Sequence, residues 1–327
     1  MRLSCGIVPA PNAPEIAALA EELGYHRAWF YDSPALYGDV WIAIARSLDR
    51  TERIGVGTAV LVPSLRHVVT TAAAIGSIEA QAPGRLAVAL GTGFTGRAMF
   101  GKPAIRWREM RDYVTALRAL LRGDEAEVDG AVCKLMSPDG VIAKRPIETP
   151  LILAVGGARA LAIAGALIAD GSADGVMCAG VIPEGVRDAQ LLTFGTVLRE
   201  GEDLESPRVQ GAIAPAIAVV YHGAYQAGGA AAVDPLPGGP GWRAEVERFS
   251  EAVRHLYVHE GHIFELTDRD RRHIHPALGA TTFTGTPEQL RERAGAYEAQ
   301  GVAELVYAPM GPDVPGELRA MRDALPH

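Results

Sequence analysis

Short apolar runs alternate with longer amphipathic segments along most of the chain, and this alternation most limits what the chain can fold into. Apolar runs separated by helical patterns are typical of parallel strands joined by crossover helices. The sequence predicts strands at residues 3–8, 27–31, 53–60, 85–90, 151–155, 175–178, 210–221 and 304–309. Because no linker-like break interrupts the series, we expect a single (β/α)8 barrel domain over residues 1–327, in the α/β class.

Helical patterns occupy the intervals between these strands. We expect helices at residues 13–23, 40–48, 68–81, 107–121, 242–260, 287–299 and 315–324, and one after each of the fifth and sixth strands. Two segments depart from the repeat and predict insertions at about 124–148 and 222–280. The first reads as a hairpin that turns on Asp129-Gly130. The second opens with a glycine-rich stretch at 224–241, which we expect to be a flexible loop.

Composition excludes several classes of protein. The 327 residues carry a net charge of −8 and show no basic stripe, which argues against a nucleic-acid partner. Cys5, Cys133 and Cys178 form no CxxC pair, so neither a disulfide framework nor a zinc knuckle is expected. The apolar stretch 150–169 has Gly156-Gly157 and an arginine at its middle, which predicts a strand, turn and helix rather than a membrane span. We therefore expect a soluble, cytoplasmic protein.

The chemistry of such a barrel is found at the carboxyl ends of its strands. Here the loops at those ends are rich in glycine and poor in titratable side chains. They contain no GxSxG, HExxH or Walker motif. A largely neutral pocket of this kind favours a bound organic cofactor that carries the chemistry.

Two glycine loops are candidates for binding an anionic part of that cofactor. Gly91-Thr92-Gly93 follows the fourth strand, with Arg97 four residues later. Gly156-Gly157-Ala158-Arg159 follows the fifth strand and begins a helix. Glycine lets backbone amides approach a phosphate, and arginine opposes its charge. The alternative is that both loops are only structural turns.

Histidines and one aspartate are the candidate titratable groups. His255, His259 and His262 have helical spacing, but no HExxH pattern or nearby cysteine accompanies them, so we expect an exposed or substrate-facing cluster and no metal. His222 follows the predicted seventh strand and is a candidate proton donor, or else a satisfied polar residue. Asp32 stands directly after the second strand, either as a turn residue or as a catalytic acid or base.

Five segments carry a resemblance to a known family. They are GTAVLVPSLRHVV at 57–69, PGRLAVALGTGFTGR at 83–97, RDYVTALRALLRGDE at 111–125, the stretch 153–171, and FTGTPEQLRERAGAYEAQGVAELVYAP at 283–309. In these segments the chain resembles the luciferase-like (β/α)8 oxidoreductases, which include bacterial luciferase and deazaflavin-dependent enzymes. The short GIVPAPN at the start is similar to the methylenetetrahydromethanopterin reductase branch.

The resemblance implies that the barrel mouth holds the ring of reduced FMN or of the deazaflavin coenzyme F420. It implies a cis peptide bond at Ala59–Val60 against that ring. Apart from the resemblance, we expect a substrate side that includes Phe94, His259 and His262, because the segment 255–275 departs from the barrel framework and loops carry specificity. The remaining cofactor contacts that the resemblance implies are Thr92, Gly93, Arg97, Gly156, Gly157, Ala158, Arg159, Gly175, Met177 and Cys178.

One difference from the family's sequence pattern argues against one of its activities. Deazaflavin-dependent sugar-phosphate dehydrogenases of the family have Asp-His and Gly-Glu where this chain has Asp32-Ser33 and Gly93-Phe94. We therefore expect F420-dependent hydride transfer to or from another small organic substrate, by a homodimer, with Asp32 or His222 handling a proton. The alternatives are a reduced-FMN monooxygenase that inserts oxygen into its substrate and a non-catalytic flavin-binding homologue.

Overall fold

The computed structural model describes residues 1–326, which form two compact units. The first unit comprises Met1–Arg97, Pro103–Leu192 and Glu298–Val306. The second comprises Ala98–Lys102, Thr193–Tyr297 and the chain from Tyr307 onward. Among these residues, no helix has the length and apolar character that crossing a membrane requires. The single-domain assignment stays a prediction.

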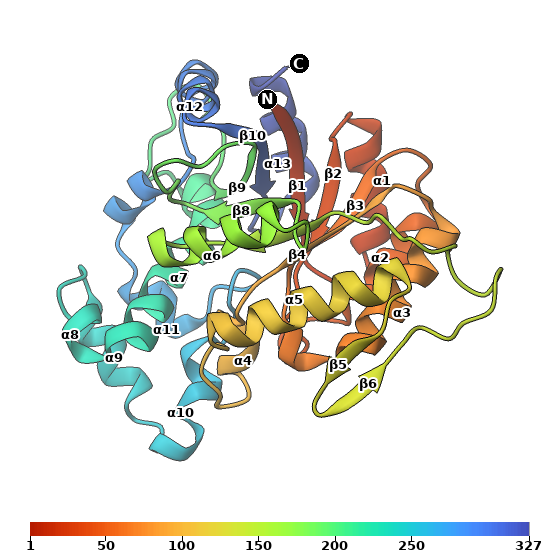
Figure 1. The fold of residues 1–327 in the computed structure, drawn as a ribbon. Coiled ribbons are helices and arrows are strands. Elements are labelled where there is room, and N and C mark those ends of the chain that lie inside the picture. Colours follow the sequence, from red (N-terminus) through yellow and green to blue (C-terminus); the bar gives the residue numbers. More distant parts are fainter. Residues whose placement is uncertain (327) are drawn as a thin grey trace. The chain divides into compact units, whose positions relative to one another are not determined.

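Eight strands within residues 1–326 form a closed parallel barrel, as the alternation predicts (Figure 1). In chain order they are β1 (Arg2–Ile7), β2 (Arg27–Phe30), β3 (Gly55–Leu61), β4 (Leu86–Leu90), β7 (Leu151–Ala154), β8 (Gly175–Ala179), β9 (Ala189–Phe194) and β10 (Val302–Ala308). Chain order is also barrel order, and β10 closes the barrel on β1. The (β/α)8 fold class is therefore confirmed.

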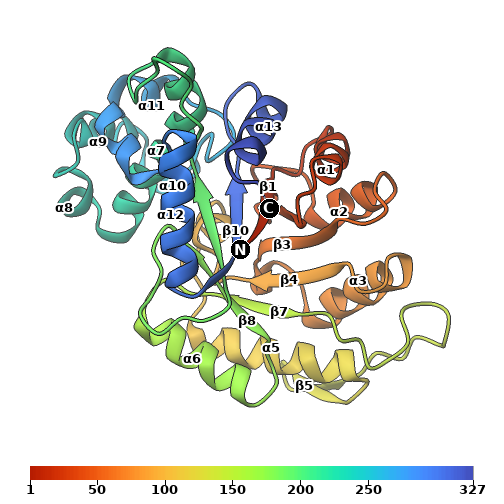
Figure 2. The ribbon, with the colours of Figure 1, turned by 90° about the horizontal axis from the view of Figure 1, so that it is seen from above.

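The helices of the first unit lie outside these strands (Figure 2). They are α1 (Ala13–Glu22), α2 (Val40–Leu48), α3 (Val68–Gln81), α4 (Phe94–Ala98), α5 (Trp107–Arg122) and α6 (Ala158–Ala169), with a 3-10 turn, η1, at Pro63–Leu65. Helix α5 buries the apolar face that its sequence predicts, including Met110, Val114 and Leu117. Strands β5 (Ala126–Val128) and β6 (Ala131–Cys133) form the predicted hairpin around Asp129-Gly130.

Side chains from several strands fill the barrel interior, with Trp29 on β2 among the largest. The indole nitrogen of Trp29 donates a hydrogen bond to Glu304 Oε1 on β10 at 2.8 Å. Gly57 leaves room for the indole ring, because a Cβ there would lie 2.6 Å from Trp29 Cζ3. The interior is thus a packed core.

Helices make up most of the second unit. They are α7 (Pro207–Gly228), α8 (Ala230–Val233), α9 (Gly239–Val246), α10 (Glu251–Val258), α11 (Asp268–His273), α12 (Pro287–Ala299) and α13 (Val314–Ala324), with a 3-10 turn, η2, at Pro276–Thr281. Trp242 on α9 is fully buried and packs with Val209, Ile213 and Tyr221 of α7 in one apolar cluster. This unit therefore has a core of its own.

The predicted seventh strand is wrong, because residues 210–221 lie inside α7. Every residue from 212 to 218 is buried, so the sequence lacks the polar positions that would have marked a helix. Strand β9, at residues 189–194, takes that place in the barrel. The flexible loop expected at 224–241 is also wrong, since it holds the end of α7, α8 and the start of α9. The helix expected at 242–260 is two helices, α9 and α10.

Candidate functional site

The loop ends of β3 and β4 meet at the mouth of the barrel. The Ala59–Val60 peptide bond is cis, as the resemblance implies, and the pairing of β3 with β4 shifts register between Thr58 and Leu61. A Cβ on Gly91 would lie only 2.3 Å from Val60 Cγ2. The Val60 side chain therefore occupies the space over Gly91, and only glycine fits beneath it.

Asp32 follows β2 and is almost completely buried. Its Oδ2 accepts hydrogen bonds from the Val62 backbone N–H at 3.1 Å and from Arg66 Nη1 at 2.7 Å. Its Oδ1 is buried and has no hydrogen-bond partner among the described residues. Burial raises the pKa of Asp32, and the hydrogen bond and charge of Arg66 only partly oppose the rise. This aspartate is held by one oxygen and retains an unused acceptor at the other.

Arg66 holds Asp32 in place, and the sequence analysis missed it. Its guanidinium also bonds Asp39 Oδ2 at 2.8 Å, so it bridges two carboxylates. Asp39 in turn caps α2 by accepting from the Trp41 and Ile42 backbone N–H groups. Burial raises the pKa of Asp39, but Arg66 and these N–H groups outweigh it and the net shift is downward. The sequence signal that could have identified Arg66 is a charged residue in the loop that follows the predicted third strand, six residues after its end.

The first glycine loop leads directly into helix α4. Gly93 has a φ of 87°, and a Cβ there would lie 2.7 Å from Val62 Cγ1. Arg97 is half-buried, and its Nε donates to the Pro103 carbonyl at 2.5 Å. Phe94 is 41% exposed, and Thr92 is half-buried. Part of the Arg97 guanidinium is therefore already engaged within the loop.

The second glycine loop presents an open helix N-terminus. Gly156 and Gly157 are exposed, and a Cβ at either would meet no described atom within 4 Å. No side chain in the described part of the chain caps the first turn of α6, where Ala158 and Arg159 are also exposed. Open backbone amides, the positive end of a helix and an arginine fit an anionic group such as a phosphate.

The predicted contacts on β8 fall at different depths of the barrel. Gly175 begins β8 beside Ile152, so it lies at the amino end of the strand rather than at the mouth. Met177 packs in the barrel interior. Cys178 is buried, and burial raises the pKa of its thiol to about 11. The position of Gly175 does not support a cofactor contact.

His222 lies on α7, so its expected place at a strand end is wrong. His259 follows the last residue of α10, so the helix face expected to include His255, His259 and His262 does not form. His222, His259 and His262 come together in the second unit, and all three are buried, which corrects the expectation of an exposed cluster. A substrate role for His259 and His262, and a catalytic role for His222, stay predictions.

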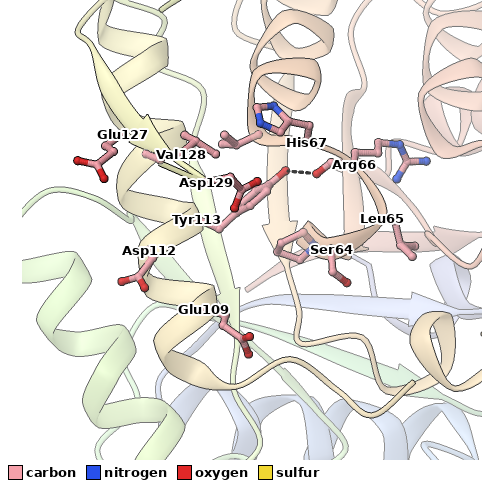
Figure 3. A pocket seen from close by; sticks show the side chains of 13 residues that line it. Ser64, Leu65, Arg66, His67, Glu109, Asp112, Tyr113, Glu127, Val128 and Asp129 are labelled. Atoms are coloured by element: carbon pink, nitrogen blue, oxygen red, sulfur yellow. Dashed lines mark hydrogen bonds between the residues drawn. The ribbon is translucent and has the colours of Figure 1, made fainter. Parts of the chain in front are cut away.

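A cavity of about 690 Å³ lies in the first unit between the loop after β3, helix α5 and the β5–β6 hairpin (Figure 3). Tyr113 stands in its wall and donates a hydrogen bond to Thr71 Oγ1 at 2.7 Å. The carboxylates that line the cavity are Glu109, Asp112, Glu127 and Asp129, against Arg66 and His67 as basic groups. This acidic lining does not suit an anionic cofactor.

Comparison with known proteins connects this geometry to a family. The profile of the family described as luciferase-like monooxygenase matches residues 6–304. A 5,10-methylenetetrahydromethanopterin reductase of Methanolobus tindarius is 28% identical over 174 residues, which cover 50% of this chain and 51% of that protein. An F420-dependent glucose-6-phosphate dehydrogenase of Beutenbergia cavernae is 31% identical over 145 residues, covering 42% and 40%. The chain thus spans about half the length of the curated relatives that it matches.

Solved structures share the fold over the whole chain at lower identity. An F420-dependent secondary alcohol dehydrogenase in complex with an F420-acetone adduct has a TM-score of 0.68 at 16% identity, with 100% of this chain and 99% of that chain covered. The oxygenating constituent of 3,6-diketocamphane monooxygenase from Pseudomonas putida, in complex with FMN, has a TM-score of 0.56 at 13% identity, covering 98% and 96%. These likenesses show the barrel fold.

Proposed function

Because the chain belongs to the luciferase-like monooxygenase family of flavin- and deazaflavin-dependent oxidoreductases, we propose that it is an F420-dependent enzyme. It moves a hydride between the coenzyme and a small organic substrate. The observation that carries this proposal is the barrel mouth itself, where Val60 stands over Gly91 and the buried Asp32 keeps an unused oxygen.

The residues present fit a flavin-type cofactor at two places. Val60 offers an apolar surface against which a flat ring can pack, and Gly91 keeps that side chain at the mouth. The open amides of Gly156 and Gly157, with Arg159, would hold the phosphate. When bound, the deazaflavin ring supplies or accepts the hydride. The protein's own contribution is to hold ring and substrate in reacting geometry.

Asp32 is the residue that we assign to the proton. Hydride transfer at a carbon that bears oxygen requires a proton to leave or reach that oxygen, and Asp32 Oδ1 is a buried acceptor at the mouth. Arg66 and the Val62 N–H fix the other oxygen, so the carboxylate keeps its orientation while Oδ1 takes the proton. The upward shift of its pKa makes that protonation easier at neutral pH than for an exposed aspartate.

The curated relatives favour F420 over FMN as the cofactor. The relatives from Beutenbergia cavernae, Intrasporangium calvum and Nocardia farcinica are all F420-dependent glucose-6-phosphate dehydrogenases. Glucose 6-phosphate is not the substrate we propose, because Ser33 and Phe94 stand where the family's sugar-phosphate enzymes carry histidine and glutamate. We propose another small organic substrate instead.

Cofactor titration tests this proposal directly. We expect F420 to bind the purified protein with a dissociation constant in the micromolar range or below, followed by fluorescence of the deazaflavin, and reduced or oxidised FMN to bind more weakly. Arg159→Ala should weaken F420 binding by about fivefold, since an exposed charge–phosphate contact contributes about 1 kcal/mol. Arg53→Ala, which removes an exposed arginine just before β3, is the matched control.

The alternatives give different results in the same assay. Tight binding of FMN with weak binding of F420 would replace the proposal by a reduced-FMN monooxygenase. Binding of neither would leave a non-catalytic homologue. The predicted homodimer is tested separately, by measuring the molar mass of the protein by light scattering as it elutes from a size-exclusion column.

A further inference from the structure

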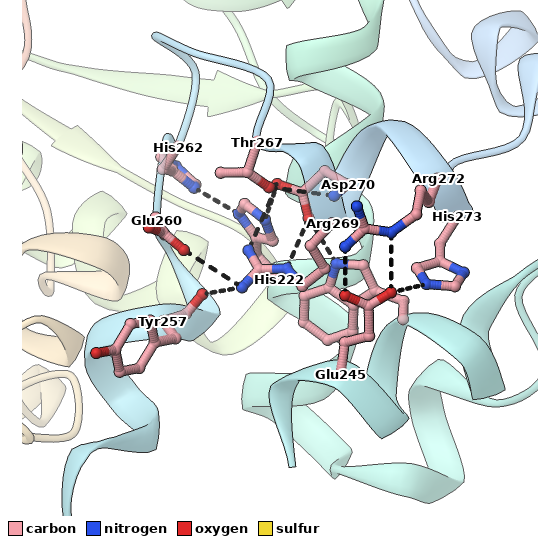
Figure 4. A network of polar contacts seen from close by, with 11 residues as sticks. His222, Glu245, Tyr257, Glu260, His262, Thr267, Arg269, Asp270, Arg272 and His273 are labelled. Carbon is pink, nitrogen blue, oxygen red and sulfur yellow. Dashed lines mark hydrogen bonds and ion pairs between the residues drawn. The ribbon is translucent and has the colours of Figure 1, made fainter. Parts of the chain in front are cut away.

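A cluster of buried imidazoles lies outside the proposed active site, entirely within the second unit. His222 comes from α7, and His259 and His262 come from the turn after α10. His222 Nδ1 lies 3.3 Å from His262 Nδ1 (Figure 4). His259 Nδ1 lies 3.4 Å from the same atom of His262. Three ring nitrogens of the same kind therefore face one another at a site with almost no solvent exposure.

Hydrogen bonds among the three rings do not account for this arrangement. The His259 Nε2 donates to the side-chain oxygen of Gln226, so in the neutral ring the His259 Nδ1 carries a lone pair. The His222 Nε2 lies 3.6 Å from Asp270 Oδ2, which favours the proton on that nitrogen and a lone pair on Nδ1. His262 Nδ1 thus faces two lone pairs and has at most one hydrogen to share between them.

A metal ion accounts for both distances. Two nitrogen ligands at about 2.05 Å from a tetrahedral zinc ion are about 3.3–3.4 Å apart, by the geometry of the tetrahedron. The two measured separations, 3.3 and 3.4 Å, have this value. Neutral imidazoles, with a lone pair on the ligating nitrogen, are the form that binds metal.

The groups behind the cluster resemble the outer shell of a metal site. Histidine ligands usually donate their second ring N–H to a carboxylate or carbonyl oxygen, as His259 does to Gln226. The Asp270 carboxylate lies 3.6 Å from His222 Nε2, as a charge partner beyond hydrogen-bond distance. Asp270 is itself fixed, because Trp242 Nε1 and Thr267 Oγ1 each donate to it at 2.7 Å. The Asp270 carboxylate is thus positioned as the charge partner of His222 and not as a ligand of the metal ion.

The local sequence HEGH explains how two of the rings meet. His262 N donates to the His259 carbonyl at 3.1 Å, which closes a turn at Gly261. Gly261 has a φ of 71°, and a Cβ there would lie 2.3 Å from the Glu265 carbonyl oxygen. Only glycine fits this turn, and the turn brings residues 259 and 262 to the same side.

We propose that His222, His259 and His262 bind one divalent transition-metal ion of the zinc type through their Nδ1 atoms. Water or a small exogenous ligand completes the tetrahedron. Because the ligands come from α7 and from the turn after α10, the ion joins two segments that are about 40 residues apart in sequence. Its role is structural, and it does not depend on the proposed function of the barrel mouth.

Metal analysis of the untagged full chain tests the proposal. After chelation and dialysis, the protein should bind about one equivalent of zinc, and cobalt(II) in its place should give the strong visible absorption of a tetrahedral site. Zinc should raise the melting temperature of the metal-free protein, because it binds the folded state. Gln226→Leu, which removes an outer-shell acceptor, should weaken zinc binding by about 10–100-fold.

Two variants separate this site from adventitious binding. His262→Ala should abolish stoichiometric zinc binding, whereas His255→Ala, a nearby histidine outside the cluster, should leave it unchanged. If His262→Ala fails to fold, the zinc and cobalt titrations of the wild-type protein decide alone. Absence of zinc binding at micromolar concentration, an octahedral cobalt spectrum, or unchanged binding by folded His262→Ala would overturn the proposal.

Discussion

Gly91→Ala tests how the barrel mouth is packed. The new Cβ would lie 2.3 Å from Val60 Cγ2, where an ordinary carbon–carbon contact is about 3.5–4.0 Å. An overlap of more than about 1 Å cannot be absorbed without moving Val60 or the strand, and overpacking of this kind costs about 1–3 kcal/mol. We expect Gly91→Ala to lower the free energy of unfolding by that amount, measured by urea denaturation followed by circular dichroism.

A second substitution identifies Val60 as the cause. In a Val60→Ala background the overlapping methyl is gone, and the nearest remaining contacts of a Cβ at position 91 are Val60 Cβ at 3.2 Å and Ala154 Cβ at 3.7 Å. Most of the penalty should therefore disappear in the double variant, although the 3.2 Å contact leaves a small part. Gly165→Ala is the control, because a Cβ there meets no described atom within 4 Å and alanine stabilises a helix by up to about 1 kcal/mol.

Either of two results would contradict the packing of Val60 over Gly91. Gly91→Ala could unfold at the same urea concentration as the wild type. Alternatively, the penalty of Gly91→Ala could be the same in the Val60→Ala background. Each result would mean that Val60 does not occupy the space above Gly91.

Three further measurements follow from the contacts. Asp32→Asn should reduce turnover by about 100-fold or more with F420 binding unchanged, and full turnover would remove Asp32 from the chemistry. Trp242→Phe should lower the free energy of unfolding by about 1–3 kcal/mol, because the Asp270 carboxylate loses a buried donor; an unchanged melting temperature would contradict this. The hydrogen bond from Arg272 lowers the pKa of Glu245 to about 2, although burial opposes the shift. The stability that the ionised Glu245 contributes is therefore fully present above pH about 4.5 and is lost as the pH falls toward 2. Glu245→Gln should therefore show a shallower loss of stability on acidification, and an identical pH profile would refute it.

The barrel could be predicted because its signal is repeated. Each of the first six strands is a short apolar run followed by a helical pattern, and their observed bounds differ from the predicted ones by two residues or fewer at each end. The prediction of the seventh strand failed because two segments of the sequence were candidates for it. Residues 189–194 form a brief strand interrupted by polar Gln190 and Thr193, whereas 210–221 is a longer apolar run. A helix buried on all sides has no polar face, and without that face periodicity does not distinguish it from a buried strand.

The candidate site was predictable only where it depends on backbone. The cis bond at Ala59–Val60 was implied by the family resemblance, and the two glycine loops follow from residue type and position. Arg66 was missed because an arginine three residues after a proline in a loop carries no periodicity of its own. The histidine cluster was misjudged for a different reason. Its members come from positions 222, 259 and 262, and helical spacing groups the last two with His255 rather than with His222.

The barrel cannot close until strand β10 has been synthesised. Strand β1 pairs with β10, and the Trp29 indole bonds a glutamate 275 residues later in the chain. At about 5–20 residues per second, translation separates these partners by about 15–55 s. During that time the nascent sheet has an open edge at β1, the kind of surface on which chains aggregate. The protein is therefore expected to need shielding by a chaperone on the ribosome more than a fold built from local contacts would.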